Sequence, residues 1–234
     1  MILMCCRRIP LFNRSLLEGQ WRGDTRFGID PPNLTLGIIG LGGIGRKVSI
    51  WADNFHMTVQ YCNRNPVLKE KNPADAKFVT LEVLLRTSDV ISIHVPLNDT
   101  TRGMIGDGQI EMMKDGCVLI NTARGPVVNE MALLKALNRG RLSCVGLDVF
   151  ENEPYILEEL RQHPHCILTP HIGSATVETQ RAMEKLAAEN VEMLVNHGKP
   201  KTPVPESMRL KDVKTVKWVW YKQWLSAFSR SPAS

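Results

Sequence analysis

Residues 36–45 read LGIIGLGGIG, and this glycine-rich segment constrains the fold more than any other part of the chain. The apolar run at 35–39 is typical of a buried parallel strand, and residues 46–52 predict a helix that follows it. The glycines between them match G-x-G-x-x-G, the turn that joins a strand to a helix in dinucleotide-binding folds. We therefore predict a dinucleotide site at this turn.

Each glycine of the motif has an expected role. Gly40 allows the tight turn, Gly42 lets the backbone approach a pyrophosphate, and Gly45 lets the helix pack closely on the strand. Gly43 and Ile44 complete the cofactor-binding loop. The phosphates are expected at the helix N-terminus, where N–H groups and the helix dipole attract anions.

The second strand, predicted at 58–62, indicates which dinucleotide is bound. Such strands usually end in an acidic residue that binds the ribose 2′-OH, but here Asn63 and Arg64 follow. A guanidinium pairs with a 2′-phosphate, whereas a carboxylate would repel it. We therefore predict NADP(H) in preference to NAD(H), with Asn63 and Arg64 at the cofactor. The alternative is that Arg64 is a solvated loop residue.

Strands and helices alternate along the rest of the chain, which predicts an α/β fold with a doubly wound parallel sheet. Further strands are predicted at 90–94, 117–121, 143–147 and 166–169, and helices at 81–85, 109–113, 130–138 and 177–196. Ligands of such sheets bind beyond the carboxyl ends of the strands. We expect His94 to line the adenine pocket at one such end, with Val95 and Pro96 also at the cofactor.

Charge and composition argue against several classes of function. Residues 207–234 hold six basic residues and one acidic residue, so this tail accounts for the net charge of +5 and the rest of the chain has no basic excess for nucleic acid. No apolar run is long enough to span a membrane. The six cysteines form no C-x-x-C pair and are read as reduced thiols of a cytoplasmic protein, and no spacing predicts a metal site.

Three residues that follow predicted strands suit the reduction of a 2-keto acid. Arg124 would bind the carboxylate and polarise the ketone, and His171 would give a proton to the developing alkoxide. Glu153 would orient the imidazole and favour its charged form. Each residue taken singly also suits a surface or loop position, but their shared place at strand ends favours a catalytic set.

Several blocks of sequence resemble the D-isomer-specific 2-hydroxyacid dehydrogenases. They are TLGIIGLGGIGRKV at 35–48, LLRTSDVISIHVPLNDTTRGMIG at 84–106, MKDGCVLINTARGPVVNEMALLKAL at 113–137, GLDVFENEP at 146–154 and LTPHIGSAT at 168–176. The Asn63-Arg64 ending is most similar to the glyoxylate/hydroxypyruvate reductase branch. The resemblance implies a reductase of a small 2-keto acid and a homodimer formed through residues 1–34.

The resemblance also implies further site residues. It repeats Arg124, Glu153 and His171 as the catalytic set, with Arg124 and Ser174 at the substrate and Asp148 at the nicotinamide carboxamide. The other residues that it implies along the cofactor are Thr101, Thr122, Ala123 and Gly173.

The chain departs from this family in its domain organisation. Relatives build the substrate domain mainly from roughly a hundred residues before the glycine loop, and only residues 1–34 stand there in this sequence. We expect 1–34 to be a remnant of the interdomain helix and linker, 35–190 the dinucleotide-binding domain, and 191–206 a segment returning toward a second domain of which only remnants are present.

Two further expectations concern the C-terminal tail and the activity of the chain. Residues 207–234 are rich in tryptophan and are expected to be a disordered extension, with an interfacial membrane helix as the less favoured alternative. Without a closing domain, Arg124 and His171 would face water, which leaves the activity of this chain open. The competing hypothesis for function is a non-catalytic dinucleotide-binding module that acts as a corepressor-like sensor.

Overall fold

The computed structural model describes residues 1–22 and 27–204. The chain divides into two compact units, one from Met1 to Gly173 and one that starts at Ser174. The predicted boundary near residue 190 and the assignment of 191–206 as a return segment stay predictions. The tail at 207–234, like residues 205 and 206, lies outside the described residues.

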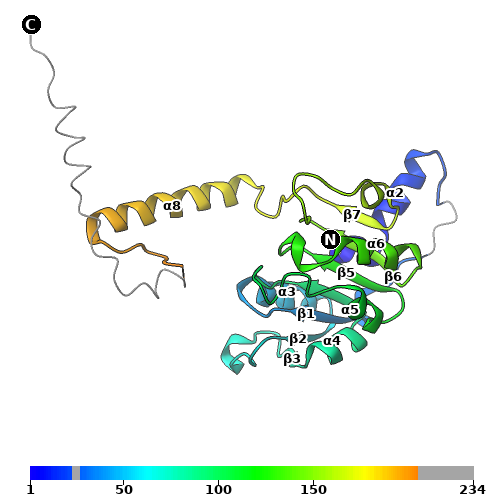
Figure 1. The fold of residues 1–234 in the computed structure, drawn as a ribbon, viewed down its shortest axis with the longest axis horizontal. Coiled ribbons are helices and arrows are strands. Elements are labelled where there is room, and N and C mark those ends of the chain that lie inside the picture. Colours follow the sequence, from blue (N-terminus) through cyan, green and yellow to red (C-terminus); the bar gives the residue numbers. More distant parts are fainter. Residues whose placement is uncertain (23–26, 205–234) are drawn as a thin grey trace, which may run out of the picture. The chain divides into compact units, whose positions relative to one another are not determined.

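The first unit is built on a parallel sheet of seven strands, in the order β3-β2-β1-β4-β5-β6-β7 (Figure 1). The strands are β1 (Thr35–Ile39), β2 (Thr58–Cys62), β3 (Lys77–Phe78), β4 (Val90–Ile93), β5 (Cys117–Asn121), β6 (Leu142–Leu147) and β7 (Cys166–Leu168). The chain starts at β1 in the centre, moves to one edge and then crosses to the other side through β4. This order confirms the predicted doubly wound α/β fold, and it places the topological switch point between β1 and β4.

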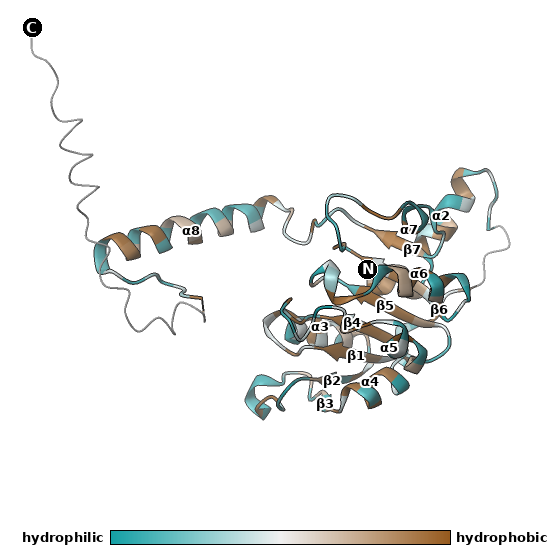
Figure 2. Ribbon diagram, in the orientation of Figure 1, coloured by the Kyte–Doolittle hydropathy of each residue, from teal (hydrophilic) through white to brown (hydrophobic). Residues whose placement is uncertain are grey.

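Helices cover both faces of the sheet, because side chains of successive strand residues point to opposite faces. The helices of the first unit are α1 (Ile2–Cys6), α2 (Ile9–Leu17), α3 (Gly43–Asn54), α4 (Leu81–Thr87), α5 (Asp107–Met112), α6 (Glu130–Asn138) and α7 (Glu158–Gln162). Leu36 and Ile38 of β1 belong to the buried cluster shared with α1 and α3, whereas Ile39 belongs to the cluster shared with α4 to α7. The central strands are accordingly hydrophobic along their length (Figure 2).

The predicted strands and helices are confirmed with shifts of a few residues at their ends. The helix after the glycine loop begins at Gly43 rather than at residue 46, because the loop's last glycines already form its first turn. The short strand β3 and helix α7 were not predicted. Two residues in β3 and five in α7 are too few to produce a recognisable hydrophobic period.

The segment before residue 18 forms two helices, α1 and α2, where a single interdomain helix was expected. Pro10 has no N–H group, so it cannot donate the helical hydrogen bond to the carbonyl oxygen of Cys6 four residues earlier. That oxygen accepts a hydrogen bond from the Ile29 N–H instead, at 2.8 Å. Arg8, with φ of 52°, makes the break between the two helices.

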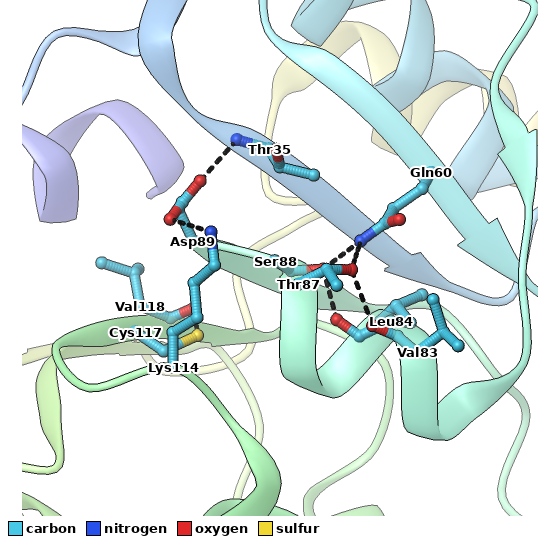
Figure 3. Close-up of polar contacts among 10 residues, drawn as sticks. All are labelled: Thr35, Gln60, Val83, Leu84, Thr87, Ser88, Asp89, Lys114, Cys117 and Val118. Carbon is cyan, nitrogen blue, oxygen red and sulfur yellow. Dashed lines mark hydrogen bonds and ion pairs between the residues drawn. The ribbon is translucent and has the colours of Figure 1, made fainter.

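Polar contacts hold the amino ends of β1, β4 and β5 and the middle of β2 (Figure 3). Asp89, the residue before β4, accepts hydrogen bonds from the Thr35 N–H and from Lys114, both at 2.8 Å. It thereby links the start of β4 to β1 and to the turn before β5. The buried amide of Gln60 donates to Thr87 at 2.7 Å and to Ser88 at 2.9 Å, which ties the end of α4 to β2. These contacts fix the strand register that delivers the site residues to the other edge.

Between residues 174 and 204, the described part of the second unit, the chain forms one long helix, α8 (Val177–His197), close to the predicted 177–196. Thr176 caps its N-terminus by accepting a hydrogen bond from Thr179 N–H, and Gly198 ends it in the left-handed conformation that favours glycine. The apolar side chains of Met183, Leu186, Val191 and Leu194 are exposed, and α8 has no buried residue. Within residues 1–22 and 27–204, no helix is both long and apolar enough to cross a bilayer.

Candidate active site

The glycine loop joins β1 to α3 at the switch point of the sheet. Gly40 has φ of +102°, and a Cβ there would lie 2.9 Å from the carbonyl group of His94. A Cβ on Gly45 would lie 2.3 Å from the carbonyl oxygen of Gly40. Both positions therefore require glycine for the protein's own packing, as the motif predicts.

Gly42 and Gly43 differ from these, because a Cβ on either would meet no atom within 4 Å. Gly42 precedes α3 with no side-chain hydrogen bond to cap the helix, and Ile44 is exposed beside it. The first-turn N–H groups of a helix attract anions. This stretch of the loop thus has the open space and the polarity that a pyrophosphate needs.

Asn63 supports the loop from β2. Its side-chain oxygen accepts a hydrogen bond from the Leu41 N–H at 2.8 Å, and Leu41 itself is buried. Asn63 therefore holds the glycine loop. Its position after β2 in the sequence does not distinguish this role from a contact with the cofactor. Arg64, the next residue, is exposed.

An open groove with a volume of about 640 Å³ runs from the glycine loop past the ends of β4 and β5. It is lined by Gly43, Ile44, Lys47, His94, Val95, Pro96, Leu97, Thr122, Ala123 and Arg124. Of the residues predicted at the cofactor, this set contains Gly43, Ile44, Val95, Pro96, Thr122 and Ala123. Thr101 is not among them, but its hydroxyl donates to the carbonyl oxygen of Pro96 at 2.7 Å and so holds the groove wall.

Lys47 and Leu97 line the groove but were not predicted. Lys47 is one helical turn after Gly43, and that four-residue spacing places the two on one face of α3. His94 also lines this groove, with Nε2 at 2.8 Å from the Ser92 hydroxyl, and its predicted place at the adenine stays a prediction. Burial lowers the pKa of His94 to about 4, so this imidazole is neutral near pH 7.

The segment after β6 contacts the segment after β7 through Glu153 and His171. Nδ1 of His171 lies 2.9 Å from Oε2 of Glu153, and Oε1 of Glu153 accepts a hydrogen bond from the Phe150 N–H at 3.0 Å. The hydrogen bond from His171 holds the pKa of Glu153 below its usual value, and the positive charge of Arg124 acts in the same direction. The carboxylate therefore remains ionised, as a group that orients an imidazole must be.

Arg124 lies on the loop after β5, and Asn121 shapes that loop. The Asn121 amide donates to the carbonyl oxygen of Arg124 at 3.0 Å and accepts from the Ala123 N–H at 3.1 Å. Gly125 then packs directly on the backbone of Phe150, because a Cβ there would lie 1.9 Å from its carbonyl group. This close contact brings the Arg124 loop against the Glu153 loop.

Asp148 occupies the end of β6 and is buried. Its Oδ1 accepts from Thr169 at 2.5 Å and from the Ile172 N–H at 2.9 Å, and its Oδ2 accepts from the Gly173 N–H at 3.0 Å. Asp148 therefore holds the segment that carries His171, and its predicted contact with the nicotinamide carboxamide stays a prediction. Ser174 begins the second unit, so its predicted contact with substrate stays a prediction.

A comparison with known protein families matches the part of the chain that contains these residues. The model of the D-isomer specific 2-hydroxyacid dehydrogenase NAD-binding domain matches residues 1–173, the whole of the first unit.

This chain belongs to the D-isomer-specific 2-hydroxyacid dehydrogenase family.

Two curated relatives of this dehydrogenase family are reductases. The chain is 45% identical over 198 residues to 4-methyl-2-oxopentanoate reductase A of Aspergillus oryzae, covering 85% of this chain and 59% of the relative. It is 40% identical over 212 residues to glyoxylate reductase 1 of Saccharomyces cerevisiae, covering 88% of this chain and 60% of the relative. The chain thus spans about three fifths of the length of these relatives.

Solved structures of the dehydrogenase family agree with the observed fold. The crystal structure of a glyoxylate reductase from Paecilomyes thermophila superposes with a TM-score of 0.85 at 42% identity, over 88% of this chain and 62% of that one. D-lactate dehydrogenase of Aquifex aeolicus, solved with NAD and lactic acid, gives a TM-score of 0.77 at 30% identity, over 87% of this chain and 68% of that one. The predicted family is confirmed, and these relatives do not favour the alternative of a corepressor-like module.

Proposed function

We propose that this chain takes part in the reduction of a small 2-keto acid, of the glyoxylate or hydroxypyruvate type, to the corresponding 2-hydroxy acid. The observation that carries the proposal is the contact of His171 with Glu153 beside the Arg124 loop, at the strand ends next to the dinucleotide groove. A reduced nicotinamide supplies the hydride when it is bound. The proposed roles of the chain's own residues are to bind, polarise and protonate the substrate.

The chemistry of each side chain supports its proposed role. The Arg124 guanidinium pairs with the substrate carboxylate and polarises the ketone, because its planar fork of donors matches a carboxylate. Protonated His171 transfers a proton to the oxygen that becomes an alkoxide as the hydride arrives at carbon. Glu153 stabilises the protonated imidazole before the transfer and keeps its ring oriented. Ser174, on the segment after His171, completes the proposed substrate contacts.

The deciding experiment uses the purified chain and measures cofactor binding and turnover separately. We expect fluorescence titration to show NADPH binding, and we expect NADPH absorbance to fall when glyoxylate or hydroxypyruvate is added. D-Glycerate is the product to be detected from hydroxypyruvate. Failure to bind either NADPH or NADH, or binding without consumption of any 2-keto acid, would contradict the proposed activity of this chain.

We further propose that NADP(H) is preferred over NAD(H), with Arg64 as the residue that binds the 2′-phosphate. Arg64 is exposed and follows β2 directly, where an acidic residue would otherwise repel that phosphate. Arg64→Gln should weaken NADPH binding by roughly ten- to a hundredfold, the effect of a lost charge-assisted hydrogen bond. NADH binding should remain unchanged.

Isothermal titration with both cofactors measures this preference. Arg46→Gln is not a suitable control, because Arg46 lies within α3. Lys69→Gln is a better one, since Lys69 is an exposed base seven residues after β2. Equal losses of NADPH and NADH affinity in Arg64→Gln would contradict the assignment.

We propose in addition that the chain forms a homodimer through the segment that contains α1 and α2. Apolar side chains there are exposed in the single chain: Leu16 at 53%, Leu17 at 78%, Trp21 at 78% and Phe27 at 80%. Multi-angle light scattering should give twice the chain mass of 26.3 kDa. Leu17→Glu should shift that mass toward the monomer, and a wild-type monomer would contradict the proposal.

The cytoplasmic location stays a prediction. All six cysteines are described and free, in keeping with a reducing compartment.

A further inference from the structure

Two glutamates outside the proposed catalytic set form a reciprocal pair next to it. Oε1 of Glu151 accepts a hydrogen bond from the Glu130 N–H at 2.7 Å, and Oε1 of Glu130 accepts one from the Glu151 N–H at the same distance. Glu130 is the first residue of α6, and Glu151 lies in the segment after β6. The pair therefore joins the start of a helix to the loop that carries Glu153.

This pair acts on the backbone that positions Glu153. The N–H groups of Phe150 and Glu151 are consecutive, and each is bound by a carboxylate: that of Phe150 by Glu153 and that of Glu151 by Glu130. Two carboxylates therefore hold this stretch of backbone, and one of them is Glu130. If the Glu151 N–H lost its bond to Glu130, only the bond between the Phe150 N–H and Glu153 would remain. Gly125 packs against the same peptide, with a Cβ position 2.5 Å from the Glu151 nitrogen. The pair thus also holds the surface on which the Arg124 loop rests.

The carboxylate of Glu130 is buried in this pair and depends on specific hydrogen bonds. Glu130 is only 6% exposed, and burial raises the pKa of its carboxyl, as does the nearby charge of Glu151. The Glu151 N–H opposes this rise by donating to the Glu130 carboxylate. The Glu151 carboxylate lies at the N-terminus of α6, where the helix dipole favours a negative charge. A buried carboxylate is costly unless such partners satisfy it, so the arrangement is maintained by specific contacts.

We propose that Glu130 and Glu151 are positioning residues that hold Glu153 in hydrogen-bond contact with His171. The proposal rests on the proposed function for its effect on catalysis, but the positioning itself is independent of turnover. Neither glutamate is assigned a contact with substrate or cofactor. Both act through the backbone of the loop after β6.

Glu151→Ala leaves the backbone N–H of residue 151 bonded to Glu130 but removes the carboxylate that ties the loop after β6 to the Glu130 N–H. Glu151→Gln keeps an oxygen that accepts this second hydrogen bond. We expect Glu151→Ala to lower kcat by roughly ten- to a hundredfold, because misplacing a catalytic group by about 1 Å has an effect of that size. The KM for NADPH should not change, since the glycine loop and groove do not include Glu151. Glu151→Gln should restore most of kcat. Glu159→Ala, at an exposed position of α7, is the matched control and should behave as wild type.

Titration of the Glu153 carboxyl by carbon-13 NMR tests the positioning without any turnover. In wild type the pKa of Glu153 is held below its usual value by the hydrogen bond from His171. In Glu151→Ala it should rise toward that usual value, and in Glu151→Gln it should stay low. A wild-type chain without turnover would count against the proposed function but would leave this measurement intact.

A folded Glu151→Ala chain with an unchanged Glu153 titration overturns the proposal, as does full kcat in that variant. Circular dichroism establishes whether the variant folds. If it does not, Glu151→Asp provides the same test, because its carboxylate is one methylene too short to keep the 2.7 Å contact without moving the loop. An unchanged Glu153 titration in folded Glu151→Asp then overturns the proposal.

Discussion

His171→Gln is expected to lower kcat for 2-keto acid reduction by about 10²- to 10⁴-fold, the usual contribution of a positioned general acid. Glutamine is similar in size and can still accept or donate a hydrogen bond near Glu153, but it has no proton to transfer at neutral pH. The affinity for NADPH should be retained, because His171 does not line the groove beside the glycine loop. Steady-state kinetics and a binding titration on the same preparation separate the two effects.

The matched control is His197→Gln, at the exposed end of α8. This variant should keep the kcat of wild type. Glu153→Gln should fall between the two, since the imidazole is still present but loses the carboxylate that orients it. Wild-type kcat in His171→Gln would contradict the general-acid role.

The lowered pKa of Glu153 sets the direction in which stability and activity are expected to change with pH. Its pKa in the folded chain is lower than 4.5, so the carboxylate and its contact with His171 are fully present above that value. As the pH falls through the folded pKa, protonation of Glu153 removes the contact and the stability that it provides. Activity should therefore fall at the acidic end because of this step, and Glu153→Gln should lose that dependence.

Gly125→Ala is expected to reduce the free energy of unfolding by about 1–3 kcal/mol or more, the range for overpacking at a close contact. The new Cβ would lie 1.9 Å from the carbonyl carbon and oxygen of Phe150. Both neighbours are backbone atoms, so no side-chain rotation relieves the clash. The loops that carry Arg124 and Glu153 must move apart, and kcat should fall together with stability.

Gly108→Ala is the control for the substitution itself. Gly108 lies within α5, and a Cβ there would meet no atom within 4 Å. Alanine favours a helix over glycine by about 1 kcal/mol, so this variant should be as stable as wild type or more so. Urea denaturation of both variants measures the difference. A Gly125→Ala chain as stable as Gly108→Ala would show that the two loops are not in close contact.

The sequence predicted the central strands and the catalytic set for a common physical reason. Buried parallel strands are continuous apolar runs, and the residues after them collect at one edge of the sheet. Arg124, Glu153 and His171 were selected by that rule, and the hydrogen bond between His171 and Glu153 and the effect of the Arg124 charge on the pKa of Glu153 agree with it. Short elements such as β3 and α7 provided no such pattern.

Other parts of the site depend on contacts that no local pattern encodes. Asn63 supports the glycine loop from 22 residues away in sequence, and Glu130 and Glu151 meet across 21. Each of these side chains has an ordinary place in its own segment, Asn63 after a strand and Glu130 in a first helical turn. Their roles appear only when the segments pack.

The sequence by itself determined the doubly wound sheet and the dinucleotide turn, because these depend on hydrophobic periodicity and on the residue types at strand ends. Tertiary structure decided which glycines make room for a ligand and which serve packing. Gly42 faces open space, as its motif suggests, whereas Gly125 touches the neighbouring loop, a contact that no sequence motif indicates. The physical reason is that close approach of two backbones depends on segments brought together by the whole fold.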